Sequence, residues 1–365
     1  MLAVNLTKIT RKLHLYLAVI SALFILNISL TGTLLVFAKE LQQYFQPQYW
    51  LVTPQTQMLD VDTLIQRVEK NSQQKIKQLR LAPLADQAWQ VHLTNGYRLS
   101  INPYSAEILY QYYPTQSFYG FVLAWHRWLL WQTPSGEKPL QVIVASVSLL
   151  LILECLLGFL IWLRPKKPLQ RLKIRFTAKT KVLVYQLHSV LGVSALIPLI
   201  LIAFTGLAFF WQNPSKIVLE TLLQSKIASV SKLKMSEQYS LALPKQQNLN
   251  QAIKQGEKVF PQGKLYQINL PFKQQPLKLR YKMPSEYHPF SWLFLDRNNQ
   301  ILQRYDASQQ NLATRVWYFK YNFHIGDFAG VASKVLWLLF ALLPCFFVLS
   351  GCWLFFARRK KPCKR

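Results

Sequence analysis

The hydrophobic positions of this chain are gathered into four long runs, separated by mixed and polar stretches. The runs cover residues 13–38, 140–163, 182–211 and 335–357. A hydrocarbon core of about 30 Å is crossed by about 20 helical residues, so each run is long enough to span a bilayer. The first run is too long for the core of a signal peptide, and no small-x-small cleavage site follows it. The pattern predicts an integral membrane protein that keeps all four helices.

The long stretches after the first and third runs have the patterns of small α+β domains. In the first, helical spacing predicts a helix over residues 60–74. Alternation predicts strands over residues 89–93 and 97–101, joined by a Thr-Asn-Gly turn. In the second, we expect a helix over residues 252–259. Its expected strands cover residues 265–270, 277–281, 291–295 and 301–305. Neither stretch carries a recognisable catalytic constellation.

Basic residues between the runs predict the orientation in the membrane. Seventeen of the 43 lie before the first run, between the second and third, or after the fourth, where no acid occurs. The positive-inside rule therefore places both termini and the middle loop in the cytoplasm. Topology thus accounts for much of the net charge of +28, and we expect no nucleic-acid partner. The remaining 26 basic residues and 14 acids leave the outer side at about +12, which would attract anionic ligands or lipid head groups.

Four of the six histidines occupy matching places on the four runs. In the first and third runs a histidine precedes a Thr-Gly pair by seventeen residues, and the other two runs each have a histidine upstream and a glycine near the end. The residues are His14, Thr31 and Gly32; His188, Thr205 and Gly206; His126 and Gly158; and His324 and Gly351. The chain therefore has the pattern of an internal duplication, with parallel halves about an axis along the membrane normal.

This symmetry would bring His14 near His188, and His126 near His324. Histidine is costly inside a bilayer and is the commonest ligand of metals and of haem iron. We therefore expect two haem b groups, with each pair as axial ligands to the iron. No Cys-x-x-Cys-His motif occurs, so the haems would be bound non-covalently. Two alternatives remain open: interfacial histidines wetted by head groups, and a bare metal site at the outer pair.

Two interpretations apply to each of Arg127, Lys334 and Glu154. Arg127 and Lys334 flank the outer histidines, and would bind haem propionates or an anionic ligand, or else extend to head groups. Glu154 lies within a run, and would serve a proton or quinone reaction or else bond to a neighbouring helix. Pro198 predicts a kink in its helix, as does Pro344.

Several short segments together carry a family resemblance. They are the two His…Thr-Gly runs and residues 89–93, 101–109, 126–130, 158–165 and 323–327. This combination resembles the PepSY-associated transmembrane family, which includes iron-regulated inner-membrane proteins and ferric-siderophore reductases. The chain departs from the family pattern at Ile325-Gly326, at Ser333-Lys334, and at Ala106, where the family commonly has glycine.

The resemblance implies a protein of the bacterial inner membrane that reduces a ferric siderophore in the periplasm. No flavin reductase domain is present in this sequence, so the electron donor would be a quinol or a separate cytoplasmic flavoprotein. The protein would act as a ferric-chelate reductase through its haems, with no catalytic side chain of its own. The alternative is a non-redox, membrane-anchored PepSY protein that binds or regulates a periplasmic partner. Anchoring alone does not require matched histidines, which counts against this alternative. A transporter is a third alternative, but four helices without a discontinuous polar span do not favour it.

The expected fold is therefore an all-α transmembrane four-helix bundle, built as a parallel internal repeat, with two periplasmic α+β PepSY-like domains. The transmembrane helices are expected within residues 1–38, 118–163, 182–212 and 315–357, the second and fourth each beginning with an interfacial segment. The periplasmic domains are expected at residues 39–117 and 213–314, the basic cytoplasmic loop at 164–181 and the basic cytoplasmic tail at 358–365.

Overall fold

The computed structural model describes residues 2–230, 247–272 and 275–359, and the chain divides into a helical unit and a sheet unit. The helical unit comprises Met1–Phe37, Val122–Val218 and Lys320–Arg365, and the sheet unit comprises Ala38–Phe121 and Leu219–Phe319. Most of the basic tail predicted for residues 358–365, including Cys363, lies outside the described residues.

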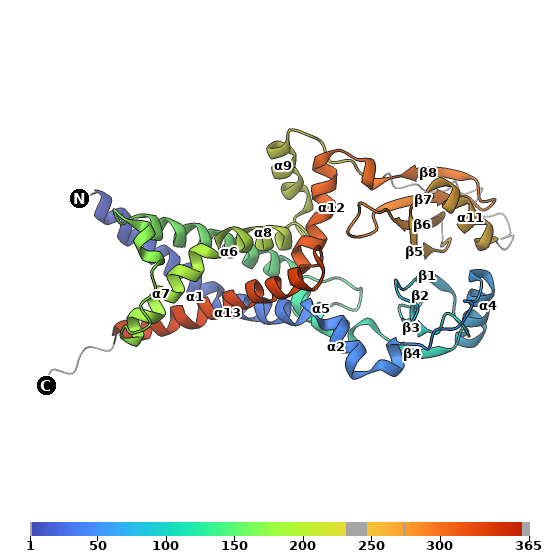
Figure 1. The fold of residues 1–365 in the computed structure, drawn as a ribbon, viewed down its shortest axis with the longest axis horizontal. Coiled ribbons are helices and arrows are strands. Elements are labelled where there is room, and N and C mark those ends of the chain that lie inside the picture. The colour runs from blue at the N-terminus through green and yellow to red at the C-terminus, as the bar shows by residue number, and fades with distance from the viewer. Residues whose placement is uncertain (1, 231–246, 273–274, 360–365) are drawn as a thin grey trace. The chain divides into compact units, whose positions relative to one another are not determined.

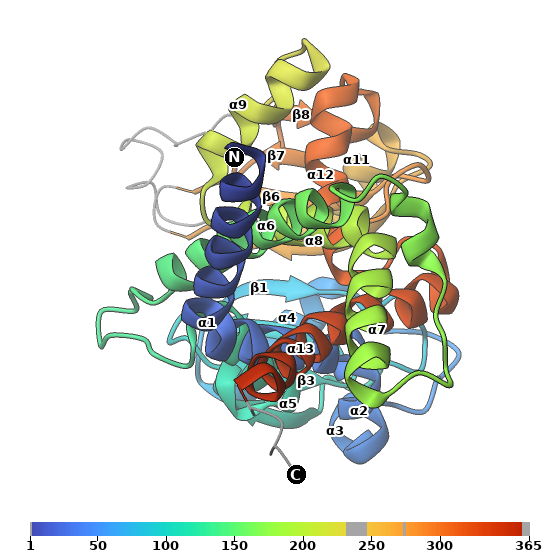
Figure 2. The ribbon, with the colours of Figure 1, turned by 90° about the vertical axis from the view of Figure 1, so that its left-hand side faces the viewer.

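Three helices of the described chain are long and apolar enough to cross a membrane. They are α1 (Leu2–Val36), α6 (Gln141–Leu163) and α13 (Gly330–Arg359). Helices α7 (Thr180–Ser194) and α8 (Leu196–Leu207) add a fourth crossing if they form one span, although they are bent by 63° against each other. Helix α1 packs against α6 and α13, α8 packs against α6, and α7 packs against α13 (Figures 1 and 2).

Two breaks in the helices have local causes. Proline has no N–H, and its ring clashes with the carbonyl four residues earlier, so Pro198 disfavours continuation of the helix past Ser194. Helix α7 ends at Ser194, which agrees with the predicted kink, whereas α13 continues through Pro344. Helix α12 (Leu312–Ile325) is followed by Gly326, whose φ of 71° is the left-handed conformation common just after a helix end.

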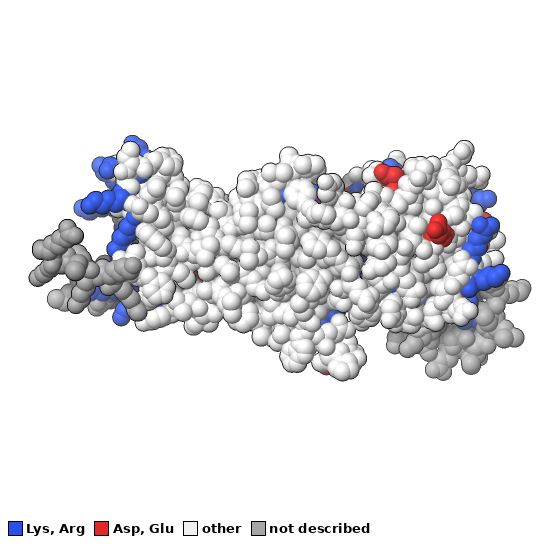
Figure 3. All heavy atoms as spheres, turned by 90° about the horizontal axis from the view of Figure 1, so that it is seen from below, with Lys and Arg blue, Asp and Glu red and all other residues white. Residues whose placement is uncertain are grey.

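The surface of the helical unit suits a lipid environment. Lys and Arg gather at the end where α1 begins and α13 ends, and the flank of the helices is almost free of charge on the face shown (Figure 3). Large apolar side chains on α1 point outward, and Val19, Ile20 and Leu23 are 61%, 67% and 74% exposed. An exposed apolar helix surface of this kind is stable in a bilayer, where the helix satisfies its own backbone groups.

The sheet unit contains one antiparallel sheet of eight strands in the order β4-β3-β2-β1-β5-β6-β7-β8. The strands are β1 (Ile76–Arg80), β2 (Trp89–Leu93), β3 (Arg98–Ile101), β4 (Ile108–Tyr112), β5 (Lys264–Asn269), β6 (Leu277–Lys282), β7 (Ser291–Leu295) and β8 (Ile301–Tyr305). The two stretches that we expected as two small domains share this sheet, because β1 pairs with β5 and places Leu79 opposite Ile268.

Two helices cover one face of the sheet. Helices α4 (Val61–Ser72) and α11 (Leu249–Val259) lie on the same side of the strands (Figure 1) and pack on a core that includes Leu79 and Ile268. The N-termini of the two helices are tied together, because the Asp62 carboxylate accepts the N–H groups of Leu249 and Asn250 at 3.0 Å each. A carboxylate at a helix N-terminus is favoured by the helix dipole, so this contact joins the two halves of the unit.

The remaining elements are short helices that connect these parts. They are α2 (Ala38–Phe45), α3 (Pro47–Trp50), η1 (Pro114–Gln116), α5 (Phe118–Trp128), η2 (Pro168–Leu172), α9 (Gln212–Leu223) and η3 (Ala307–Gln309). In the turn between β3 and β4, Ala106 has a φ of 63°. An alanine in the left-handed backbone conformation costs about 1–2 kcal/mol relative to glycine. This cost explains why glycine is common at this place in the family that the sequence resembles.

We expect Leu79→Ala to destabilise the sheet unit by about 2–5 kcal/mol, because it opens a cavity where the two halves meet. The measurement is chemical unfolding of the full chain in detergent, followed by tryptophan fluorescence. Gln111→Ala, on the exposed edge strand β4, is the control and should change the free energy of unfolding by less than about 0.5 kcal/mol. Equal losses in the two variants would show that the junction of β1 with β5 does not support the core.

Candidate functional site

Two of the four predicted histidines lie together in the helical unit. His126, near the end of α5, and His324, near the end of α12, have ring centroids 6.3 Å apart and ring planes inclined by 51°. They come from the two halves of the sequence, as the repeat predicts. The sequence alone could not give the distance between them, because it depends on how α5 and α12 meet.

Each of these imidazoles is held by a threonine on another helix. Thr31 Oγ1 lies 3.0 Å from His126 Nδ1, and Thr205 Oγ1 lies 3.0 Å from His324 Nδ1. Both hydroxyls donate their only hydrogen to their own helix, Thr31 to Asn27 O at 2.8 Å and Thr205 to Leu201 O at 2.9 Å.

The threonine oxygens therefore act as acceptors, and each histidine donates from Nδ1–H. His324 Nδ1 also lies 3.1 Å from the Ile202 carbonyl, which can only accept. With Nδ1 protonated in a neutral imidazole, Nε2 keeps its lone pair. This is the tautomer that a histidine needs in order to bind a metal through Nε2.

A glycine allows each histidine to approach the neighbouring helix. A Cβ atom on Gly32 would lie 3.2 Å from His126 Cε1, and one on Gly206 would lie 3.2 Å from His324 Cε1. A side chain at either position would therefore require the imidazole to move by a few tenths of an ångström. This contact gives a physical reason for the Thr-Gly pairs, since the threonine bonds the ring and the glycine makes room for it.

The second pair repeats the arrangement with small differences. His188 Nδ1 lies 2.7 Å from Ser350 Oγ, and Cβ atoms on Gly351 and Gly158 would lie 3.8 Å from His188 Cε1 and 3.6 Å from His14 Cε1. His14 lies close enough to His188 to interact with it electrostatically.

His14 is the exception among the four. Its Nδ1 is buried without a hydrogen-bond partner, and the residue before its glycine is Leu157, which has no hydroxyl group. Ser350 was not predicted from the sequence. Its position directly before Gly351, like that of Thr31 before Gly32, is the signal that could have identified it.

The two pairs lie at different levels of the helical unit. His14 lies on α1, and the contact of His126 is with Thr31 of the same helix, seventeen residues further on. At a rise of about 1.5 Å per residue, the two levels are about 25 Å apart along the helix axis. This is most of the thickness of a hydrocarbon core.

The four imidazoles are half-buried, and His126, His188 and His324 make their printed hydrogen bonds through Nδ1. One turn after His188, a Cβ atom on Gly192 would meet nothing within 4 Å. Among the described residues, no group of three or more His, Cys, Asp or Glu could hold a metal ion. In the described chain the histidines thus occur in pairs and not in a larger cluster of metal-binding side chains.

The other predicted residues lie in varied surroundings. Arg127 is exposed, with its guanidinium 5.9 Å from the Trp128 ring centre, while Lys334 Nζ lies 3.8 Å from Asp327 Oδ1. Ser21 Oγ lies 2.5 Å from Glu154 Oε1. Glu154 is therefore hydrogen-bonded to the neighbouring helix α1, which was one of the two interpretations from the sequence.

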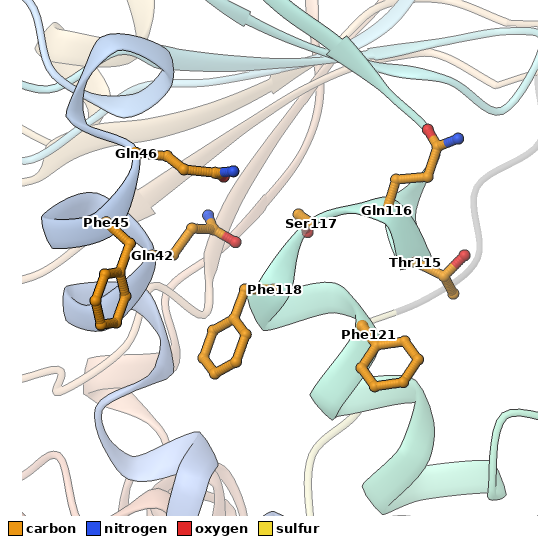
Figure 4. Close-up of a pocket in the computed structure, with 8 residues that line it drawn as sticks. All are labelled: Gln42, Phe45, Gln46, Thr115, Gln116, Ser117, Phe118 and Phe121. Atoms are coloured by element: carbon orange, nitrogen blue, oxygen red, sulfur yellow. The ribbon is translucent and has the colours of Figure 1, made fainter.

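A hollow in the sheet unit is a separate candidate site. It has a volume of about 510 Å³ and lies between α2 and the segment from Thr115 to Phe121 (Figure 4). Amide groups and phenyl rings line it, without any His, Cys, Asp or Glu. Gln42 is already used there, since its Oε1 accepts the Tyr119 N–H at 3.0 Å. The hollow offers no metal ligand, and the histidine pairs remain the best-developed site.

The comparisons with known proteins agree with the resemblance. The model of the PepSY-associated TM region matches residues 11–358, which is nearly the whole chain, and the chain therefore belongs to this family. No curated protein matches the chain. The matched range includes all four paired histidines and their glycines.

We expect Thr205→Val to lower the free energy of unfolding by about 1 kcal/mol more than Thr33→Val does, because Thr205 accepts a hydrogen bond from a histidine and Thr33 does not. Thr33 is the matched control, since its hydroxyl makes the same local bond to the carbonyl four residues earlier, Ser29 O at 2.8 Å. The measurement is thermal unfolding of both variants in the same detergent. Equal losses would show that the contact between Thr205 and His324 contributes nothing.

Proposed function

We propose that this chain, a member of the PepSY-associated transmembrane family, is a transmembrane oxidoreductase with two non-covalent haem b groups. His126 and His324 would be the axial ligands of one haem, and His14 and His188 those of the other. The protein would pass electrons from a donor on the cytoplasmic side to an acceptor in the periplasm. In this proposal the acceptor is a ferric siderophore, and its reduction releases the iron.

The observation that carries the proposal is the spacing of His126 and His324. An imidazole nitrogen binds a metal at about 2.0 Å and lies roughly 1.1 Å from its own ring centre, so one metal between two imidazoles separates their centroids by about 6 Å. The centroids are 6.3 Å apart. Two rings in edge contact can have the same centroid distance, so the assignment also uses the position of each Nδ1 atom beside Thr31 or Thr205.

The hydrogen bonds at Nδ1 support the same assignment. Metal-binding histidines usually donate their other N–H to a carboxylate, carbonyl or water, which fixes the tautomer and the ring orientation. Thr31 and Thr205 accept in this way from the outer pair. Ser350 lies at the same position for His188, so three of the four histidines have this support.

The number of ligands favours haem over a bare metal ion. Structural zinc takes four protein ligands and catalytic zinc takes three, whereas a haem brings four nitrogens of its own and leaves two axial positions. Each site offers two histidines, and no larger group of metal-binding side chains occurs among the described residues. The open space at Gly192 would accommodate the edge of a flat macrocycle.

A bound haem supplies one-electron redox chemistry, and the residues of the chain set the conditions for it. The histidines fix the axial ligation, the threonines and Ser350 orient them, and the apolar helices lower the local dielectric. Arg127 is exposed and would be available to a propionate or an anionic ligand, whereas Lys334 already has Asp327 as a partner.

The direction of transfer rests on the charge pattern. The basic end of the helical unit (Figure 3) would face the cytoplasm by the positive-inside rule. His14 and His188 would lie on that side, since they are in the first parts of α1 and α7, next to the basic segments of the sequence. The bent pair α7 and α8 would then be one span, which completes a four-helix bundle built as a parallel repeat in the inner membrane. The sheet unit would lie in the periplasm, and the donor would be a quinol or a cytoplasmic flavoprotein.

The first prediction of this proposal concerns cofactor content. Protein purified from haem-replete cells should show a low-spin spectrum with sharp α and β bands after reduction, because both irons would have two imidazole ligands. A pyridine haemochrome assay should find about two haems per chain. A colourless protein would instead support the non-redox alternative, in which the spans only anchor a PepSY domain that binds a periplasmic partner.

The two haem sites should also be separable. We expect His188→Ala and His324→Ala each to remove about one of the two haems, and the double variant to remove both. His288→Ala is the control, because His288 lies in the sheet unit beside Tyr266 and should leave both haems in place. If His14→Ala and His324→Ala gave the same spectral loss without additivity, the pairing would be wrong.

A further inference from the structure

The face of the sheet that α4 and α11 leave uncovered carries two rows of residues in register across all eight strands. The first row is Tyr110, Ser100, Gln90, Arg80, Gln267, Arg280, Trp292 and Tyr305. The second row is Tyr112, Arg98, His92, Gln78, Asn269, Lys278, Phe294 and Gln303. We call this surface the polar face.

The polar face is cationic along its middle and aromatic at its ends. Four of its residues are cations, Arg80, Arg98, Lys278 and Arg280, and none is a carboxylate. The aromatic ends are partly covered, since Tyr49 of α3 stacks on Tyr110 at 4.3 Å between centroids, and Tyr318 of α12 lies 6.4 Å from Tyr305. The middle strands β1 and β5 carry Arg80, Gln78 and Gln267, of which Gln267 is buried and the other two are half-buried.

The positive charge on this face affects its neighbouring groups. Burial, followed by Arg98, Arg80 and Lys77, lowers the pKa of His92 to about 3. Burial, followed chiefly by Arg280, also lowers the pKa of His288 to about 3. Both imidazoles are therefore neutral at physiological pH, and neither adds to the positive charge or offsets it.

Polar atoms at the centre of the polar face have no partner in the described chain. Three atoms there are buried and make no hydrogen bond: Arg80 Nε, Gln78 Nε2 and Gln267 Oε1. The Gln267 residue as a whole is only 5% exposed. These residues are neighbours, since Arg80 is opposite Gln267 across the pairing of β1 with β5, and Gln78 is two residues from Arg80 on β1. Native proteins leave few buried polar atoms unsatisfied, so three at one place indicate a ligand.

We propose that the polar face binds the acceptor of this protein, and that the acceptor is a polyanionic, oxygen-donor metal chelate with flat aromatic groups. Arg80 would bind the anionic oxygens, Gln78 and Gln267 would bond to the remaining oxygens and hydroxyls, and the aromatic ends would pack on the periphery of the ligand. A ferric catecholate has this chemistry, whereas an uncharged ferric hydroxamate does not. The identity of the ligand as an electron acceptor rests on the proposed function, but the binding site itself does not.

The chemistry of the aromatic groups also supports this choice. The Arg80 guanidinium lies 5.7 Å from the Tyr266 ring centre, and the Arg280 guanidinium lies 4.9 Å from the Trp292 ring centre. Arginines stacked on aromatic rings are held in place and can still direct their N–H groups at planar oxygens. A flat anionic ring matches such a surface better than a compact anion does.

The test uses the full chain in nanodiscs and redox-inert gallium chelates, so that binding is measured without electron transfer. We expect the wild-type protein to bind gallium tris-catecholate, to bind uncharged gallium trihydroxamate much more weakly, and to lose affinity as the salt concentration rises. Arg80→Gln should weaken tris-catecholate binding by about tenfold or more, and Arg280→Gln should do so independently. Arg67→Gln is the matched control, since Arg67 is an exposed arginine of α4 on the covered side of the sheet.

Three outcomes would overturn the proposal: no binding by the wild-type protein, equal binding by Arg80→Gln and Arg67→Gln, or displacement of the chelate by inorganic phosphate at equal concentration. A thermal unfolding midpoint equal to that of the wild type would show that Arg80→Gln is folded. The result is independent of the haems. Binding of gallium chelates without reduction of the ferric forms would contradict the proposed function alone, whereas haem reoxidation by ferric chelates without gallium-chelate binding would contradict the polar face alone.

Discussion

The contact between a histidine ring and a glycine of the neighbouring helix is the constraint on which the helical unit depends. It is tight at Gly32 and Gly206, where an added Cβ would lie 3.2 Å from the ring, and ordinary at Gly158 and Gly351, where the distances would be 3.6 and 3.8 Å. In three of the four cases a hydroxyl beside the glycine lies within 3.0 Å of the histidine Nδ1. These contacts join α1 to α5, α8 to α12, α1 to α6 and α7 to α13. The same packing that holds the helices together thus also orients the histidines, which is the arrangement that the proposed haem ligation requires.

The sheet unit shows the same duplication in a different form. Each half contributes four strands and one helix that covers the sheet, and the halves join through β1 and β5 and through the contact of Asp62 with the start of α11. This union places Arg80 beside Gln267 and produces one broad polar face. Two separate domains would have presented two narrow sheets with exposed edges, which are prone to unwanted pairing.

Much of the fold and of the site could be predicted from the sequence because both depend on local spacing. The apolar runs, the paired histidines, the helix over α4 and most of the strands follow directly from periodicity. Strands β1 and β4 were not predicted. At β1, a register shift between Ile76 and Gln78 places Ile76 and Leu79 on the same face at a spacing of three. The union of the two halves and the role of Ser350 depend on contacts between residues far apart in the sequence, which no local pattern records.

The most direct measurement of the central claim is an anomalous difference map at the iron edge, from crystals of the protein purified from haem-replete cells. We predict two iron peaks about 25 Å apart, one between His126 and His324 and the other between His14 and His188. No iron peak, or an iron atom away from all four histidines, would contradict it.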